Sequence, residues 1–292
     1  MRVTVIGGSG FLGSHVADQL SESGHEVAIY DREVSRHLRP GQRMAVGDLL
    51  DVPRLRAAIE GAEAVYNFAA LADLNAARDR PLDTARINVV GNIEVLEACR
   101  AANVRRFVYA STVYVHSREG GFYRCSKQAA EHYTEEYQRT YGIDYTILRY
   151  GSLYGPRADA SNGLFRVVSR ALETGIIRYE GSPDALREYI HVEDAARASV
   201  AALGDEFRNQ SVVLTGQEPM RVRDLLEMLA EILGLRAGVE FVPQDQPGHY
   251  VRTPYAYEPR IGRKYVPPLH VDLGQGLVQL IEDIQRRRSV AP

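Results

Sequence analysis

The sequence predicts an α/β protein, a doubly wound parallel sheet with a smaller α/β lobe toward the C-terminus. Strand-like and helical segments alternate regularly over the first 150 residues, which is typical of parallel strands joined by right-handed helical crossovers. A glycine-rich stretch directly follows the first strand, where such sheets bind nucleotides. Beyond residue 150 the pattern loosens into Gly, Pro and polar segments, so we expect a second unit there.

Six strands are expected in the first half, each a short apolar or β-branched run. They cover residues 3–6, 26–30, 43–46, 64–68, 106–110 and 145–149. Four helices alternate with them at residues 14–21, 52–60, 85–102 and 123–141. The second helix begins around Pro53, and proline suits the first turn of a helix. The third carries apolar residues at helical spacing from Ile87 to Leu96.

The second half combines helices with short strands. Helices are expected at residues 165–172, 192–203, 222–233 and 274–287, and short strands at 189–192 and 211–214. We therefore expect residues 1–150 to form a dinucleotide-binding domain that carries the catalytic residues. Residues 151–292 are expected to form mainly a substrate-binding lobe, with a segment of about 187–203 returning to the first domain.

The composition is that of a globular enzyme, with 292 residues of which 45% are hydrophobic and 25% charged. A net charge of −3 gives no reason to expect nucleic acid or an anionic membrane as a partner. The cysteines Cys99 and Cys125 define no disulfide framework, and the histidines show no metal-ligand spacing. No apolar run approaches the ~20 residues that span a bilayer, so the cytoplasm is the expected compartment.

A glycine-rich segment between the first strand and the first helix has the pattern of a phosphate-binding loop. The motif consists of Gly7, Gly10, Phe11, Leu12 and Gly13. A backbone without side chains can approach a pyrophosphate closely, and a helix N-terminus offers free N–H groups with partial positive charge. An ordinary glycine turn is the alternative, and the position between a strand and a helix favours the nucleotide loop.

An acidic residue, Asp31, ends the second strand eighteen residues after Gly13. Its carboxylate can accept hydrogen bonds from both ribose hydroxyls and repels a 2′-phosphate, so it favours NAD over NADP. Arg32 beside it slightly weakens that preference. Asp48 and Leu49 follow the third strand, where a carboxylate can reach an adenine amino group. An acid at a helix N-terminus is an equally good interpretation of Asp48.

Small and hydroxyl-bearing residues follow the next two strands. Phe68, Ala69 and Ala70 come after the fourth strand, and we expect them to line the floor beneath the cofactor. Ser111 and Thr112 end the fifth strand, where a hydroxyl can hydrogen-bond a substrate alcohol. On its own, such a pair equally suits a turn or a helix cap.

Tyr123 and Lys127 form a Tyr-x-x-x-Lys pattern at the start of a predicted helix. Residues four apart share one helix face, so the phenol and the ammonium can point into one cleft. A free tyrosine has a pKa near 10, and a neighbouring ammonium or an oxidised nicotinamide favours the phenolate. Removing a proton from an alcohol while hydride leaves its carbon is the chemistry that such a pair serves.

With these motifs in order along the chain, the sequence resembles an extended short-chain dehydrogenase/reductase of the NAD-dependent nucleotide-sugar epimerase/dehydratase family. The resemblance covers nearly the whole length, and it is carried outside the glycine loop by residues 108–114, 148–157 and 187–195. It implies a Rossmann-type domain with NAD as the cofactor and a nucleotide-diphosphate sugar as the substrate.

The resemblance also implies residue roles. Tyr123 is the catalytic base, with Lys127 as its partner and ribose ligand. Thr112 orients the substrate hydroxyl, while Ser111 lies near the nicotinamide; which of the two hydroxyls orients the substrate stays open. Tyr150 and the residues after it pass close to the nicotinamide. The substrate contacts are expected at Ser152, Asn162, Arg187 and Arg252.

The departures from the family pattern narrow the reaction. The loop between the hydroxyl pair and Tyr123 is short, with only residues 115–122, which is expected to open the sugar end of the site. Dehydratases and decarboxylases of the family carry an acid near Thr112, and here Val113 and Tyr114 follow it. With Tyr123 as the only proton-transfer group, the expected reaction is oxidation at C4 and re-reduction from the other face.

Three alternatives remain open at this level. One is a reductase or dehydrogenase of the same fold, and another is a dehydratase that draws its acid from elsewhere, such as Glu119 in the short loop. The third is a non-catalytic dinucleotide sensor, which an intact Tyr123 and Lys127 disfavour. The helices at 85–102 and 123–141 are further expected to form a four-helix, two-fold dimer interface, as in resembling enzymes.

Overall fold

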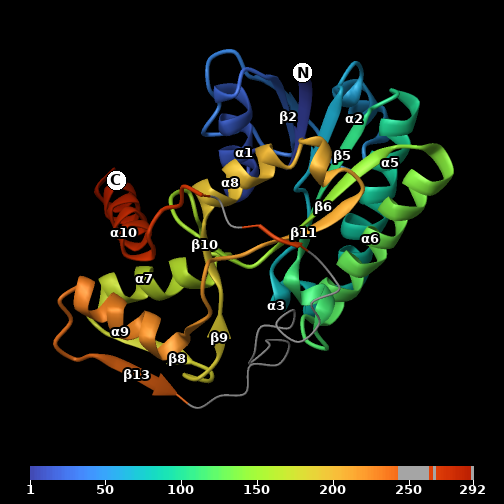
Figure 1. Ribbon diagram of the computed structural model, residues 1–292. Helices are drawn as coiled ribbons and strands as arrows, with labels where there is room; N and C mark the ends of the chain where they lie inside the picture. Colours follow the sequence, from blue (N-terminus) through green and yellow to red (C-terminus); the bar gives the residue numbers. More distant parts are fainter. Residues whose placement is uncertain (243–262, 266–267, 291–292) are drawn as a thin grey trace.

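The computed structural model describes residues 1–242, 263–265 and 268–290 (Figure 1). Arg252, expected to contact substrate, lies outside the described residues.

The first domain is built on one eight-stranded sheet with the order β14-β11-β6-β5-β4-β1-β2-β3. Its strand pairs are all parallel. The strands are β1 (Arg2–Ile6), β2 (Glu26–Asp31), β3 (Arg43–Val46), β4 (Ala64–Asn67), β5 (Arg106–Thr112), β6 (Asp144–Tyr150), β11 (Gln210–Leu214) and β14 (Arg263–Lys264). The order 3-2-1-4-5-6 is that of a doubly wound dinucleotide-binding sheet, so the predicted fold class is confirmed.

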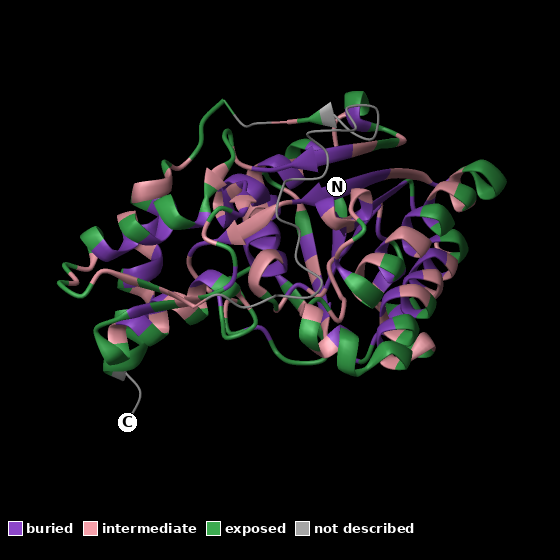
Figure 2. Ribbon diagram, turned by 90° about the horizontal axis from the view of Figure 1, so that it is seen from below, coloured by how far each residue is buried: buried purple, intermediate pink, exposed green. Residues whose placement is uncertain are grey.

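Helices cover both faces of this sheet (Figure 1). One face carries α1 (Phe11–Glu22) and α8 (Val192–Ala201), and the other carries α2 (Val52–Ile59), α5 (Gly91–Ala101) and α6 (Gly121–Tyr141). Side chains alternate along a strand, so Val5 packs with α1 while the adjacent Ile6 packs on the opposite side. Figure 2 shows the buried strands between half-exposed helices. This double covering explains why the strands are continuous apolar runs.

The helix predicted over residues 85–102 is wrong in detail. The segment comprises α4 (Pro81–Ala85), a π-helical turn at Arg86–Val90, and then α5. Inside the π turn, Asn88 accepts a hydrogen bond from Leu71 N at 2.7 Å and donates to Ser126 Oγ at 2.9 Å. These tertiary contacts tie the turn to the loop after β4 and to α6. Apolar spacing does not reveal such a change in backbone hydrogen bonding.

Most short elements escape prediction because a few residues carry no periodicity, although β10 (Tyr189–His191) and β11 were expected at 189–192 and 211–214. Helix α3 (Leu74–Asp79) has one local signal, since Asp73 caps it by accepting from Ala76 N at 2.8 Å. In the part of the smaller lobe that the structure describes, there are three two-stranded ladders and three helices. They are β7 (Ser152–Tyr154) with β10 (Tyr189–His191), β8 (Ile177–Glu180) with β13 (Val239–Val242), β9 (Leu186–Arg187) with β12 (Met220–Arg221), and α7 (Gly163–Thr174), α9 (Val222–Ile232) and α10 (Leu273–Val290).

The lobe has a hydrophobic core of its own. Val168, Leu229 and Leu280 from its three helices pack in one buried cluster, whereas α8 packs with α1 on the large sheet. On these clusters we propose the division into a dinucleotide-binding domain of residues 1–150 and mainly a substrate lobe of 151–292, with the chain returning to the first domain at about 187–203. It returns again at β11 and β14, which lie in the large sheet.

Three histidines are held neutral by the fold. Burial lowers the pKa of His15, His116 and His191 to about 4. His15 Nε2 donates to Pro156 O at 3.0 Å, and His191 caps α8 by accepting from Glu193 N at 3.4 Å. Each therefore binds its proton more readily in the unfolded chain, whose histidine pKa is about 6.5.

We expect the contribution of these neutral histidines to the free energy of unfolding to be complete above pH ~6.5 and to be lost as the pH falls toward 4. In this window the unfolded state binds more protons, and each fully coupled histidine contributes a slope of about 1.4 kcal/mol per pH unit. Urea midpoints measured between pH 7 and pH 4 should fall accordingly, and His191→Asn, which keeps a capping acceptor, should flatten the slope. The exposed His132→Gln is the control; an equal flattening there would contradict the assignment.

Candidate active site

The glycine loop forms a cradle that leaves no room for side chains. Gly7 has a φ of +76°, and a Cβ on it would lie 2.6 Å from Ala69 N. A Cβ on Gly13 would lie 2.2 Å from Gly7 O. Helix α1 starts after Gly10 without a side-chain cap, so its first N–H groups, including those of Phe11 and Leu12, are oriented as in a phosphate site. The cradle fits the pyrophosphate of a dinucleotide.

Asp31 is placed beside this cradle by the end of β2. Its Oδ2 accepts from Ser9 N at 2.9 Å, and its Oδ1 accepts from Arg32 N at 2.7 Å. These backbone donors hold the carboxylate at the loop, where a ribose would follow the pyrophosphate. The side chain of Arg32 is exposed. The arrangement fits the predicted ribose contact of Asp31.

The side chains of Asp48 and Leu49 lie in different environments, one exposed and one buried. Asp48 is exposed, and its Oδ1 accepts from Leu50 N at 2.9 Å in the turn before α2. Its contact with adenine stays a prediction. Leu49 is buried in the core beside Gly91, whose Cβ would lie 2.4 Å from Leu49 Cδ2. The packing of α5 on the sheet holds this side chain in place, and its contact with the cofactor stays a prediction.

The segment from Phe68 to Ala70 lies directly beneath the glycine loop, as expected of a floor. A Cβ on Gly7 would come within 2.8 Å of Phe68 C, so the two backbones touch. The ring of Phe68 stacks on that of Tyr66, with centroids 5.9 Å apart. The backbone contact between Gly7 and Phe68 joins the carboxyl ends of β1 and β4, the switch point at which doubly wound sheets bind ligands.

Tyr123 and Lys127 meet Thr112 at the same edge of the sheet. Burial raises the pKa of Tyr123 to about 12, and a hydrogen bond with Thr112 opposes that rise. Lys127 is 2% exposed, its Nζ donates to Ala110 O at 2.7 Å, and it lies 5.8 Å from the centre of the Tyr123 ring. Burial lowers the pKa of Lys127 to about 7, and the charge of Glu131 opposes that fall.

Ser111 does not take part in this group, contrary to its predicted catalytic role near the nicotinamide. Its hydroxyl donates to Glu131 Oε1 at 2.5 Å. Side chains two apart share a strand face, so Ser111 lies on the α6 side of the sheet with Phe107 and Tyr109. The hydroxyl bonded to Tyr123 is that of Thr112.

The candidate site residues at and just after the end of β6 lie in two places, Tyr150 in the core and Ser152 in the lobe. The hydroxyl of Tyr150 is 2.7 Å from Ser199 Oγ in the core beneath α8. Strand alternation turns this side chain inward, and the passage of Tyr150 and the residues after it near the nicotinamide stays a prediction. Ser152 is half-buried on β7 and pairs with Tyr189.

The remaining substrate candidates lie in the lobe. Asn162 caps α7, with Oδ1 accepting from Phe165 N at 3.0 Å and Nδ2 donating to Leu153 O at 2.8 Å. Its amide is therefore engaged structurally. Arg187 is buried on β9 and donates to Leu186 O at 2.9 Å. Their contact with a diphosphate stays a prediction.

Two residues that the sequence reasoning missed hold the short loop before Tyr123. Arg124 donates to Ser117 O at 2.8 Å, and Gln128 donates to Val115 O at 2.8 Å. The two lie one helical turn apart on α6, and this spacing is the signal that indicates a common face. The loop is thereby anchored to the helix that carries the proposed base.

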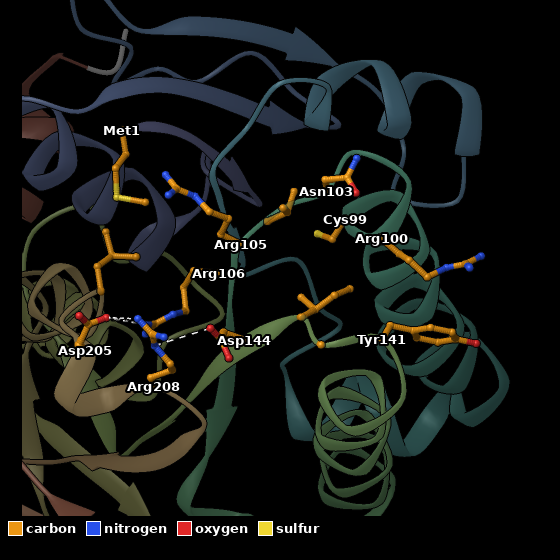
Figure 3. A pocket seen from close by; sticks show the side chains of 14 residues that line it. Met1, Cys99, Arg100, Asn103, Arg105, Arg106, Tyr141, Asp144, Asp205 and Arg208 are labelled. Atoms are coloured by element: carbon orange, nitrogen blue, oxygen red, sulfur yellow. Dashed lines mark hydrogen bonds and ion pairs between the residues drawn. The ribbon is translucent and has the colours of Figure 1, made fainter.

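A separate cavity of about 810 Å³ opens at the amino ends of β5 and β6 (Figure 3). Arginines surround it, and they have acidic partners: Arg208 contacts both Asp205 and Asp144, while Arg106 lies 3.9 Å from Asp205. Helices α5 and α6 end at this rim, where cations stabilise helix C-termini. The glycine loop and Tyr123 lie at the carboxyl ends of the strands, so this cavity is not the candidate active site.

Metal sites and membrane spans are further features that bear on function. Within the described ranges, no group of three or more His, Cys, Asp or Glu side chains is arranged to hold a metal ion. No helix in that same part of the chain is both long and apolar enough to cross a membrane.

Comparison with known proteins identifies the family. The family model described as "NAD dependent epimerase/dehydratase family" matches residues 3–214. A putative UDP-glucose 4-epimerase of Methanocaldococcus jannaschii is 27% identical over 80% of this chain and 83% of that protein. The crystal structure of Thermotoga maritima UDP-glucose 4-epimerase with UDP-glucose is 25% identical, with a TM-score of 0.86 over 99% of this chain and 100% of that one. That of Thermus thermophilus UDP-glucose 4-epimerase with NAD is 27% identical, with a TM-score of 0.83 over 98% and 99%. The chain therefore belongs to the NAD dependent epimerase/dehydratase family, which confirms both the family and the cofactor expected from the sequence.

Proposed function

We propose that this protein is an NAD-dependent epimerase of nucleotide-diphosphate sugars that acts by transient oxidation at C4, with Tyr123 as the base. The observation that carries the proposal is the placement of Tyr123 against Thr112 and Lys127, at the sheet edge that also bears the glycine loop. Relatives named as UDP-sugar epimerases support the substrate class.

NAD, when bound, supplies a carbon that accepts hydride and returns it. The residues of the chain manage the proton. Tyr123 Oη takes the proton of the sugar hydroxyl, Thr112 Oγ1 orients that hydroxyl, and the proton returns from Tyr123 when the keto group is reduced. Since hydride returns to the opposite face of the carbon, the configuration at C4 is inverted and nothing is consumed.

Deprotonation of the Tyr123 phenol is the main energetic requirement of this reaction. Lowering the pKa of this phenol from about 12 to near 7 takes roughly five units, or ~7 kcal/mol. The ammonium of Lys127 and the positive charge of the oxidised nicotinamide both favour the phenolate. Tyrosine and lysine titrate as a coupled pair, because loss of the phenol proton in turn favours the ammonium form of Lys127.

The surroundings of Thr112 favour epimerisation over dehydration. A dehydratase needs a further acid and base at this point, and the next two residues, Val113 and Tyr114, form a 3₁₀ turn with Val113 buried. Glu119 in the short loop is the alternative acid. Its backbone N–H donates to Ser117 Oγ at 2.9 Å.

Incubation of the purified protein with UDP-glucose, UDP-galactose and UDP-glucuronate tests the proposal. We expect inversion at C4, followed by proton NMR of the sugar, without net change in NADH absorbance. A 4-keto dehydrated product would identify a dehydratase, and net formation or loss of NADH would identify a dehydrogenase or reductase. If the protein binds NAD but leaves every sugar unchanged, the non-catalytic dinucleotide sensor would be the remaining interpretation.

Asp31 is expected to set the cofactor preference. Asp31→Ser removes the carboxylate held at the ribose position, and we expect about tenfold weaker NAD binding, as for a lost charged hydrogen bond of about 1.4 kcal/mol. Discrimination against NADP should fall as well. Calorimetric titration with each dinucleotide measures both effects. Glu33→Gln removes an exposed charge nearby, and an equal loss of NAD affinity in that variant would contradict a specific role for Asp31.

We also propose a homodimer in which the helices of the α5 and α6 layer pair across a two-fold axis. Large hydrophobic side chains are exposed there, with Val90 at 47%, Phe122 at 50% and Tyr133 at 45%. Since α6 carries Tyr123 near its start, this pairing would also stiffen the site.

Tyr133→Lys is expected to raise the dimer dissociation constant at least about tenfold, because it places a charge in a desolvated contact. Sedimentation velocity over a concentration series measures the constant. Ile232→Lys, on an exposed position at the end of α9, should leave the association unchanged. A wild-type protein that sediments as a monomer at all concentrations would refute the dimer.

A further inference from the structure

A buried ion pair joins α6 to β6 just behind the proposed catalytic residues. Arg149 Nε lies 3.0 Å from Glu131 Oε1, and Arg149 Nη2 lies 2.7 Å from Glu131 Oε2. Both side chains are almost fully buried, at 7% and 6% exposure. This is the bidentate fork in which a guanidinium binds a carboxylate most strongly and with defined geometry.

The pair connects the elements that carry the site. Glu131 accepts a hydrogen bond from the hydroxyl of Ser111, the residue before Thr112 on β5. Arg149 Nη1 also donates to His116 Nε2 at 3.2 Å, at the end of the 3₁₀ turn that begins after Thr112. Because burial and Arg149 lower the pKa of His116 to about 4, its ring stays neutral and can accept this bond at neutral pH.

Glu131 lies one helical turn beyond Lys127 and two turns beyond Tyr123 on the same helix. The ammonium of Lys127 is held by Ala110 O at 2.7 Å and lies 4.7 Å from the centre of the Tyr109 ring. Successive residues of β5 therefore contact α6. Residues 109 and 110 contact Lys127, residue 111 contacts Glu131, and residue 112 contacts the phenol of Tyr123.

We propose that Glu131 and Arg149 are a positioning pair that locks α6 against β5 and β6, so that Tyr123 and Lys127 stay in register with Thr112. The proposal deepens the proposed function and rests on Tyr123 being the base. Neither residue of the pair is taken to touch substrate.

The positioning role of this pair can be distinguished from a contribution to stability, because the two predict different effects of substitution. A buried ion pair is often no more stabilising than apolar side chains of similar volume, whereas an unpaired buried charge is strongly destabilising. The titratable and charged groups around Lys127 are Tyr109, Tyr123 and Glu131, and those around Glu131 include Arg149 and Tyr145. Removing only Glu131 takes away the negative charge that opposes the fall in the pKa of Lys127, which disfavours the ammonium and hence the phenolate.

The test compares Glu131→Gln with the double variant Glu131→Leu/Arg149→Met in the NAD-loaded protein. Tyr123 is titrated by phenolate absorbance, with Tyr123→Phe as the baseline, so this readout needs no sugar substrate. For Glu131→Gln we expect the midpoint to rise by about one pH unit, a tenfold change in proton affinity. We expect kcat to fall about tenfold in both variants with KM nearly unchanged, while the double variant regains the unfolding midpoint of the wild type.

Glu135→Gln makes the same change on the exposed side of α6, where Glu135 contacts His132 at 3.6 Å, and should alter neither readout. If the double variant does not fold, Ser111→Ala gives a milder test and should lower kcat in the same direction by two- to threefold. Loss of stability with an unmoved Tyr123 titration and unchanged kcat would overturn the proposal. A wild type without epimerase activity would refute the proposed function, while the titration would still decide the role of the pair.

Discussion

Tyr123→Phe is expected to lower kcat by about 10²- to 10⁴-fold, the contribution typical of a positioned general base. The substitution removes the hydroxyl that meets Thr112 with Lys127 nearby, and it leaves the aromatic ring near the start of α6. The glycine loop and Asp31 are untouched, so NAD should bind with wild-type affinity. Steady-state kinetics with the preferred UDP-sugar and calorimetry with NAD measure the two quantities separately.

Tyr137→Phe is the matched control on the same helix. It also removes a hydroxyl, which donates to Glu97 Oε1 at 2.6 Å away from the site, and kcat should stay within a factor of about two, as expected for a group outside the chemistry. A Tyr123→Phe enzyme that keeps more than a tenth of the wild-type kcat would exclude Tyr123 as the base.

Gly13→Ala is expected to weaken NAD binding by at least about a hundredfold and to destabilise the fold by roughly 1–3 kcal/mol, the usual cost of overpacking. The new Cβ would lie 2.2 Å from Gly7 O and 2.9 Å from Gly8 Cα. Both neighbours are backbone atoms, so the loop itself must shift and its N–H groups leave their aligned positions. Calorimetry with NAD and urea unfolding measure the two effects.

Gly163→Ala provides the comparison, because Gly163 also lies in the first turn of a helix. Its Cβ would meet only Arg166 Nη2 at 3.9 Å, and alanine is favoured over glycine in helices by about 0.5–1 kcal/mol. Stability should therefore be equal or slightly higher. A Gly13→Ala protein that binds NAD like the wild type would show that the loop does not hold the pyrophosphate.

Much of the first domain was predictable because its signals are local. The strand at Arg43–Val46 matches the prediction at both ends, and the helix from Val52 ends within one residue of it. Apolar runs and helical periodicity mark such segments directly. The short strand β10 was expected at 189–192, whereas the other short strands of the lobe and the π turn at Arg86–Val90 were missed. Their pairing and hydrogen bonding depend on residues distant in sequence.

The candidate site shows the same division. Asp31 and the glycines lie together as expected, since a strand end and a helix start are adjacent in both chain and space. The sequence did not show that the side chains of Leu49 and Tyr150 lie in the core, because the packing of α5 and α8 on the sheet decides this. Asn162 proved to be a helix cap, and its pattern of an Asn before an apolar helix would have indicated this.

By itself the sequence determined the order of strands and helices, the glycine loop and the Tyr-x-x-x-Lys pair, because each is written within a few consecutive residues. Only the tertiary structure decided that Thr112 and not Ser111 meets Tyr123, and that Glu131 and Arg149 form a buried pair behind them. The physical reason is that a side chain's partner depends on which face of its strand another element covers, and packing between distant segments decides that face.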